Sequence, residues 1–346
     1  MTGNARRQTV RGVFTAGMLL LISYVPTARA LQEKINPRSE YQYKKDYTQV
    51  EGIMKEADAQ KRSDLLLGFV KEHPQSRMLP YVAGYYGQIV APYAQAGNWK
   101  KVVEMYEKFL EPLPPGDKEV TNDSKTILTS LMGAYYQTGN FVKAAELGEK
   151  LYELDKDKKM AFALADIYLR MQNTDKYVVY AEKILAEFPM EQVYATALQM
   201  AQVHLQKQNV AKATECVSKV MQVYGDKVPP GAQESAWNNS RAFAFGLMGA
   251  DAYGKKDYAK ALEHYERVAK FAPKSDEAYY YIGMSKWRSQ DPEGAISAFA
   301  KAAVLGKATA KRAQEYLEQL WKARHNDTLD GLDQTLAKAK SDLGIS

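Results

Sequence analysis

A helical pattern of apolar residues that returns at a fixed interval constrains this chain more than any other feature of its sequence. Between residues 258 and 271, apolar side chains recur three or four positions apart, and charged side chains fill the positions between them. This spacing predicts an amphipathic helix, which ends before Pro273 because proline has no backbone amide hydrogen to donate. The same design returns in residues 276–306. Helices of this kind bury their apolar faces by stacking in series.

Small residues stand where the two helices of a pair would touch, and aromatic residues stand where the gap to the next pair must be filled. Within residues 242–309, these positions are held by Gly249, Ala261, Tyr265, Gly283, Ala295 and Phe299. The unit resembles the tetratricopeptide repeat, a pair of helices with a characteristic period. The frame also fits residues 124–227 and degrades before residue 124. The resemblance implies an all-α, right-handed α-solenoid of about seven antiparallel helix pairs with a C-terminal capping helix.

The repeat frame divides the chain into four parts. They are a signal peptide, degenerate N-terminal helical repeats, tetratricopeptide repeats and C-terminal capping helices, at residues 1–30, 31–123, 124–309 and 310–346. A final helix over residues 329–343 is expected to be capped by Asp327 or Thr328. The segments 111–123 and 224–235 are rich in proline, glycine and polar residues, and are predicted to be loops.

The first thirty residues have the order of a secretory signal peptide. Three arginines precede the apolar run 13–25, and Ala28 and Ala30 supply the small residues of a cleavage site. The run is shorter than the roughly 20 apolar residues that a membrane-spanning helix needs. We therefore expect cleavage before Leu31 and a mature protein in the periplasm or cell envelope of a bacterium. An uncleaved membrane anchor is the alternative.

The charge balance limits the classes of partner, and the cysteine content limits the possible crosslinks within the chain. The chain carries 47 basic and 41 acidic residues, and loss of the four arginines in the leader leaves 43 and 41, or about +2. The basic and acidic residues are mixed along the same segments, so no nucleic-acid partner is expected. No integral membrane segment is expected after cleavage. The single cysteine, Cys216, excludes an internal disulfide, and its apolar neighbours predict a buried thiol.

The stretch from Gly249 to Lys256 begins like a phosphate-binding loop, since two glycines five positions apart precede a lysine. The next position should be Ser or Thr but is Lys256. A phosphate-binding loop also follows a strand, whereas the residues before Gly249 are typical of a helix. The stretch is therefore interpreted as the corner between two helices, with Asp257 as the cap of the second.

The histidines form no recognisable catalytic or metal-binding pattern. His73, His204, His264 and His325 are scattered, and no paired cysteine or carboxylate cluster accompanies them. His264 is expected on the partly exposed flank of its helix. The sequence therefore predicts no catalytic, metal or cofactor site and no enzymatic activity. A glycan-processing enzyme with its site in residues 31–123 is a minor hypothesis.

Aromatic and basic residues collect where the resemblance places a groove. Tyrosine occurs 24 times against 10 phenylalanines, and its hydroxyl favours a wet edge. In tetratricopeptide arrays the first helix of each pair lines the concave face, and here this rule selects Tyr136, Arg170, Gln202, Tyr253, Tyr280, Tyr281, Met284, Trp287 and Arg288. Tyrosine, tryptophan and arginine are common at binding hot spots. The alternative, favoured for Tyr279, is that rings pack between adjacent first helices.

These observations favour a non-catalytic scaffold of the bacterial cell envelope that binds a peptide or protein segment in its concave groove. The alternative is a structural or assembly factor for an outer-membrane or cell-wall complex. Chaperone-binding members of the family hold a C-terminal carboxylate with Lys and Asn at fixed first-helix positions. Those positions here hold Tyr280, Tyr281, Met284 and Gln314, so this clamp is expected to be absent.

Overall fold

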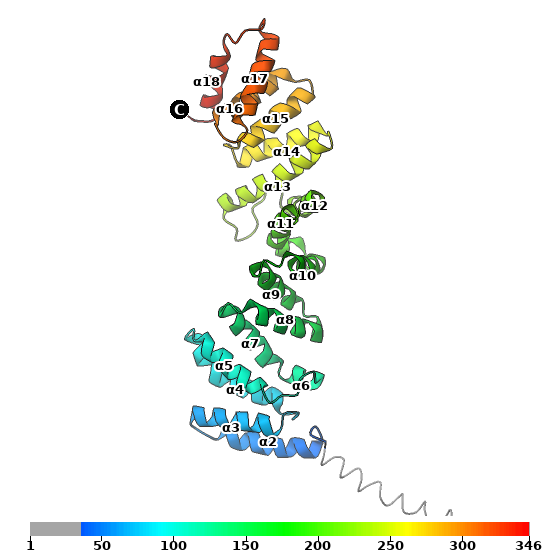
Figure 1. Cartoon of the computed structure of the whole chain (residues 1–346), viewed down its shortest axis with the longest axis vertical. Coiled ribbons are helices and arrows are strands. Elements are labelled where there is room, and N and C mark those ends of the chain that lie inside the picture. Colours follow the sequence, from blue (N-terminus) through cyan, green and yellow to red (C-terminus); the bar gives the residue numbers. More distant parts are fainter. Residues whose placement is uncertain (1–35, 346) are drawn as a thin grey trace, which may run out of the picture. The chain divides into compact units, whose positions relative to one another are not determined.

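The computed structural model describes residues 36–345. Within this range every regular element is an α-helix, and Figure 1 shows the helices following one another along the chain. The chain divides into two compact units, residues 1–172 (unit 1) and residues 173–346 (unit 2). The all-α expectation is thus confirmed for the described residues. The predicted leader, residues 1–30, lies outside them.

Unit 1 contains three helix pairs, α2–α3, α4–α5 and α7–α8, followed by α9. The bounds of its helices are α2 (Glu40–Met54), α3 (Ala59–Glu72), α4 (Leu79–Gln95), α5 (Trp99–Leu110), α6 (Lys118–Asp123), α7 (Lys125–Gln137), α8 (Phe141–Asp155) and α9 (Lys158–Arg170). The second pair contacts the third through α5 against α7, and α8 packs against α9.

Unit 2 contains α10, three further helix pairs and two terminal helices. The bounds are α10 (Thr174–Glu187), α11 (Met190–Gln206), α12 (Val210–Tyr224), α13 (Glu234–Gly254), α14 (Tyr258–Phe271), α15 (Asp276–Arg288), α16 (Pro292–Val304), α17 (Ala310–Arg324) and α18 (Leu332–Asp342). The helices α14 and α16 begin at Tyr258 and Pro292, one repeat period apart, as the repeat frame predicts. From α11 through α17, successive helices pack against each other.

The turn inside five of the pairs has the same chemistry. A residue with left-handed backbone comes first, and an Asn or Asp follows as the N-cap of the second helix. The cap side chain accepts a backbone N–H bond from three residues further on, which satisfies one of the free donors at a helix start. The five corners are Gly97–Asn98, Gly139–Asn140, Gln208–Asn209, Lys256–Asp257 and Gln290–Asp291.

Two glycines one repeat period apart allow the first and second helices of a pair to approach closely in unit 2. A Cβ atom on Gly249 of α13 would lie 2.9 Å from the ring of Tyr265, and one on Gly283 of α15 would lie 2.7 Å from the ring of Phe299. A methyl group therefore cannot be added without moving a buried ring. The interpretation of residues 249–256 as a corner is confirmed, because they end α13 and turn into α14.

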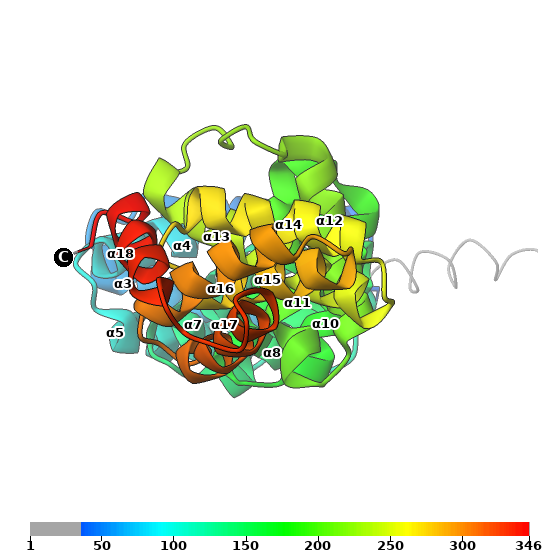
Figure 2. The same cartoon turned by 90° about the horizontal axis from the view of Figure 1, so that it is seen from above.

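The two predicted loops have different outcomes. The segment 111–123 is not a loop throughout, because Asp117 accepts the backbone N–H bonds of Glu119 and Val120 and starts the short helix α6. Residues 225–233 do connect α12 and α13 as a loop, which stands out from the helices in Figure 2. Trp237 of α13 holds this loop, since its indole nitrogen donates to the carbonyl of Lys227 at 2.9 Å.

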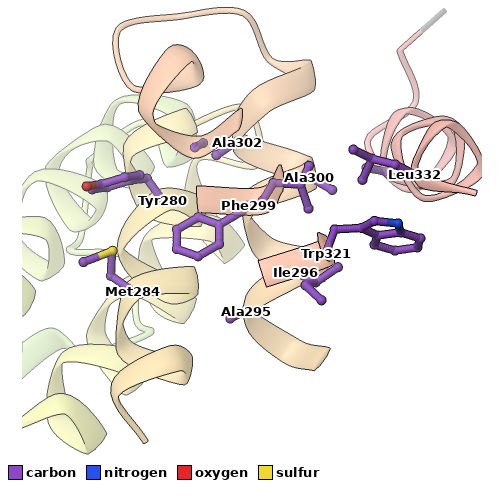
Figure 3. Packing of buried hydrophobic residues seen from close by; sticks show 12 residues of the cluster. Tyr280, Met284, Ala295, Ile296, Phe299, Ala300, Ala302, Trp321 and Leu332 are labelled. Carbon is purple, nitrogen blue, oxygen red and sulfur yellow. The ribbon is translucent and has the colours of Figure 1, made fainter. Parts of the chain in front are cut away.

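The helix α18 closes the end of unit 2. Its Leu332 and Ala339 belong to the same buried cluster as Phe299 of α16, and Figure 3 shows Leu332 beside Trp321. The predicted cap at Asp327 or Thr328 is wrong. Asn326 and Asp327 have left-handed backbone, so the chain makes a longer turn, and α18 begins after Gly331.

Candidate partner-binding surface

The nine residues predicted to face a groove come from five first helices. In unit 1, Tyr136 lies on α7 and Arg170 on α9. In unit 2, Gln202 lies on α11, Tyr253 on α13, and the other five on α15. Because the two units are separate compact bodies, the residues of each unit form a separate candidate surface.

Rings from three first helices of unit 2 meet in two pairs. The rings of Tyr253 and Tyr281 lie 5.4 Å apart edge to face, which joins α13 to α15. The rings of Trp287 and Tyr316 lie 5.5 Å apart, which joins α15 to α17. All four side chains are half-buried. We call Tyr253, Tyr281, Trp287 and Tyr316 the aromatic row.

Arg288 adds a positive charge to the aromatic row. It is exposed, and its guanidinium carbon lies 5.4 Å from the ring centroid of Trp287, within the range of a cation–π contact. Burial raises the pKa of Tyr253, while a hydrogen bond from Arg288 acts in the opposite direction. The row therefore combines apolar ring faces with hydroxyl, indole and guanidinium groups, which suits a peptide more than a purely apolar ligand.

Two of the predicted groove residues lie mostly inside unit 2. Tyr280 is 9% exposed and Met284 7%, and both belong to the buried cluster that contains Phe299. Figure 3 shows both side chains beside Phe299. The structure gives them a packing role, while a role in partner contact stays a prediction. Tyr279 packs against the same cluster, as the alternative reading expected, and Gln202 is exposed on α11.

In unit 1 the structure brings Tyr136 and Arg170 together through a shared carboxylate. The hydroxyl of Tyr136 donates to Asp166, and Nε of Arg170 lies 3.0 Å from the same carboxylate. The guanidinium also lies 4.9 Å from the ring centroid of Tyr136. The hydrogen bond to Asp166 is the main reason that the pKa of Tyr136 is raised. These three groups already satisfy one another at the surface.

A pocket of unit 1 was missed by the sequence analysis. It has a volume of about 600 Å³ and lies between α4 and α7, with residues of α5 such as Val102 also lining it. None of its lining residues is charged. Gly84 and Gly133 line it, and a Cβ atom on either would meet nothing within 4 Å. The sequence signal that could have predicted this pocket was the pair of glycines on two first helices, Gly84 and Gly133, because neither has a bulky side chain packed against it.

Residues of the catalytic-triad types meet in unit 1 but are arranged differently. The hydroxyl of Ser76 donates to Asp46 and accepts the backbone N–H bond of Met78, and Nδ1 of His73 lies 3.6 Å from Asp46. In a triad the serine hydroxyl bonds to the histidine, which takes its proton. Ser76 and Asp46 are each 1% exposed, so this group ties α2 to the turn before α4.

The remaining titratable groups of interest are buried. The expectation that His264 lies on an exposed flank is wrong, because it is 6% exposed and stacks on Phe245 under α13. Burial lowers the pKa of His264 and of His204. The expected burial of Cys216 is confirmed, and this burial raises the pKa of the thiol.

Within residues 36–345, no group of three His, Cys, Asp or Glu side chains could hold a metal ion.

Hydropathy gives a separate result. Among the helices of the described range, none combines the length and the apolar character that crossing a bilayer requires.

Comparison with known proteins supplies structural likeness only. No protein-family profile and no curated protein matches the sequence. Among solved structures, YrrB, a TPR protein with an unusual peptide-binding site, is 14% identical, with coverage of 62% of this chain and 99% of that one and a TM-score of 0.41. A tetratricopeptide repeat protein from Parabacteroides merdae is 17% identical, with coverage of 80% and 98% and a TM-score of 0.35. The Naa15/Naa10 structure bound to HypK-THB is 14% identical, with coverage of 87% and 39% and a TM-score of 0.46.

Proposed function

We propose that this array of tetratricopeptide-like helix pairs is a non-catalytic interaction scaffold that binds a peptide or protein segment on the first helices of unit 2. The observation that carries the proposal is the aromatic row, in which two pairs of half-buried rings from α13, α15 and α17 are linked through the ring of Tyr280, with Arg288 beside Trp287. Rigid rings with polar edges give large contact area at a low entropic cost, and such groups dominate binding energies at protein interfaces.

Site-specific photocrosslinking in the source cell tests this function. A photoreactive phenylalanine in place of Trp287 should capture a discrete partner. The same group in place of Val210, which is exposed on α12 of the same unit, is the control and should not. Pull-down of that partner by a chain without the photoreactive group should be lost when Trp287→Ala and Tyr281→Ala are combined. Equal capture from both positions, or a captured set that the double substitution leaves unchanged, would show that the row is not the binding surface.

We also propose that the protein acts in the periplasm or cell envelope after cleavage of its leader. The support is the order of arginines, apolar run and small residues in residues 1–30. N-terminal sequencing of the protein from fractionated cells should give Leu31 as the first residue. A first residue well before Leu31 would favour a retained anchor.

A further inference from the structure

A second pocket in unit 2 lies next to the aromatic row. It has a volume of about 360 Å³ and lies between the first helices α13 and α15, with α14 behind it and Leu205 of α11 at one side. Tyr265 of α14 lines it, and its ring stacks on Tyr281 of the row at 4.8 Å and 9°. A segment that lies on the row can therefore extend a side chain into the pocket.

The walls of this pocket are apolar. Phe243 and Leu247 of α13 and Val268 of α14 supply them. Gly246 keeps the space between α13 and α14 open, since a Cβ atom there would only reach van der Waals contact with Val268, at 3.9 Å. Walls of this kind suit a hydrocarbon chain, because each methylene group buried against them makes binding more favourable.

The polar groups of the pocket give it an acidic character. Glu277 is the only charged residue among those that line it. It is exposed in the first turn of α15, and within residues 36–345 no basic side chain forms a salt bridge with it. A carboxylate near a helix N-terminus is favoured by the helix dipole, so Glu277 needs no basic side chain of its own chain to be stable there.

A polar atom at the base of the pocket also lacks a partner. Tyr265 is 2% exposed, and its hydroxyl makes no hydrogen bond with any described residue. Burial is the main reason that the pKa of this hydroxyl is raised, and the charge of nearby Glu277 adds to the effect. Leaving a buried hydroxyl without a hydrogen bond is unfavourable, because its lost contacts with water are not replaced. A donor group brought in by a ligand would recover part of that free energy.

We propose that this pocket accepts a lysine side chain of the bound segment, an inference that rests on the proposed function. The four methylene groups lie against Leu247 and Val268, and the ammonium group pairs with the carboxylate of Glu277 and can donate a hydrogen bond to the hydroxyl of Tyr265. Lysine combines such an apolar stem with a charged end that remains close to water. The partner is therefore a segment with a basic side chain flanked by residues that contact the rings.

Binding of short synthetic peptides to the full chain tests the pocket without knowledge of the natural partner. The probe is an acetylated and amidated pentapeptide of alanine with a central lysine, and its matched controls carry norleucine or arginine there. Isothermal titration at low salt should give the lysine peptide about ten-fold tighter binding than the norleucine peptide, as expected for one charge-assisted contact. Arginine should bind less tightly than lysine, because its stem has one methylene group fewer to bury against the apolar walls.

Two substitutions assign the effect to the pocket. Glu277→Gln should reduce the affinity for the lysine peptide about ten-fold and leave the norleucine peptide unchanged. Tyr265→Phe should reduce it a few-fold without lowering the melting temperature, since it removes only a hydroxyl that has no partner. Glu263→Gln, which removes a charge of α14 outside the pocket, is the control and should have no effect.

The inference is overturned if the lysine peptide shows no saturable binding at peptide concentrations up to about 10 mM, because a dissociation constant above that value is weaker than one useful contact would give. Equal binding of the lysine and norleucine peptides would also overturn it, as would equal effects of Glu277→Gln and Glu263→Gln. Each of these results leaves the photocrosslinking test at Trp287 untouched, so the failure of the pocket and the failure of the binding surface are distinguishable.

Discussion

Glycines on first helices have opposite surroundings in the two units. In unit 2, Gly249 and Gly283 face the rings of Tyr265 and Phe299 so closely that a methyl group would collide with them. In unit 1, Gly84 and Gly133 face an open pocket, and a methyl group would touch nothing. The comparison shows that a glycine of a first helix is required for packing only where a side chain of a neighbouring helix opposes it closely. Gly246 of α13, whose Cβ atom would come no closer than 3.9 Å to Val268, leaves space in unit 2 as well.

The corners of the helix pairs differ in a related way. The corners inside the pairs α4–α5 and α7–α8 of unit 1 have glycine at the left-handed position, Gly97 and Gly139, although Gln172 at the end of this unit is also left-handed. Unit 2 has Gln208, Lys256 and Gln290 there, with φ between 58° and 63°. Residues with a Cβ atom are strained in this conformation by about 1–2 kcal/mol each, so these three corners carry strain that the corners at Gly97 and Gly139 do not.

The largest effect is expected from a substitution that breaks the close contact between Gly283 and Phe299 in unit 2. Gly283→Ala should destabilise the protein by about 1–3 kcal/mol, because the added methyl group overlaps the buried ring of Phe299. Urea-induced unfolding followed by circular dichroism measures the change. Gly249→Ala should act in the same direction through Tyr265. Unchanged unfolding midpoints for both variants would contradict the packing role of these glycines.

The next largest effect is expected from a substitution that removes backbone strain at a corner of unit 2. Gln290→Gly should stabilise the protein by about 1 kcal/mol, because glycine adopts a left-handed backbone without the Cβ clash. The reciprocal change Gly139→Gln in unit 1 should destabilise it by a similar amount. Both are measured as shifts of the urea midpoint, and shifts of the same sign for the two variants would refute the comparison of the corners.

A smaller effect concerns the open pocket of unit 1. Gly133→Ala should stabilise the protein by about 0.5–1 kcal/mol, since alanine favours a helix and the new methyl group has free space. This is the opposite sign to Gly283→Ala, although both changes are glycine to alanine in a first helix. A destabilised Gly133→Ala protein would show that the pocket is narrower than the structure has it.

The smallest expected effect is a pH dependence specific to unit 2. Because burial lowers the pKa of His264 and His204 in the folded protein, the unfolded chain binds protons more readily. Stability from these residues is therefore full above the unfolded-state pKa of about 6.5 and is lost as the pH falls below that value. Unfolding free energies of the His264→Phe variant and the unchanged protein should converge or cross as the pH falls through this range, since a phenylalanine side chain cannot titrate. Parallel pH profiles would exclude this role.

The sequence predicted local structure well where a single helix pair decides it. The bounds of α14 follow from its apolar stripe, from Asp257 and from Pro273, and the contact of Gly249 with Tyr265 follows from their positions in the repeat. These features depend on residues close together in the chain, so the pattern contains the necessary information.

The misses at Tyr280 and His264 depend on side chains of other helices. Tyr280 is covered by Tyr316 and the cluster around Leu317, which belong to α17 and not to its own pair. His264 is buried because Phe245 of the preceding helix stacks on it. A repeat frame ranks positions along one helix but does not say how far the other helices cover them. For the same reason the pocket between α4 and α7 could not be read from either helix alone.

The helix α18 has a consequence for how molecules of this protein can associate. It covers α16 with Leu332 and Ala339, and Asp342 fixes it there through a salt bridge to Lys301 at 3.1 Å. Stacked repeats that end in an uncovered apolar face can add another molecule head to tail and grow into filaments. The helix α18 occupies that face and turns a polar side outward, so it blocks this route of head-to-tail growth at the α18 end of unit 2.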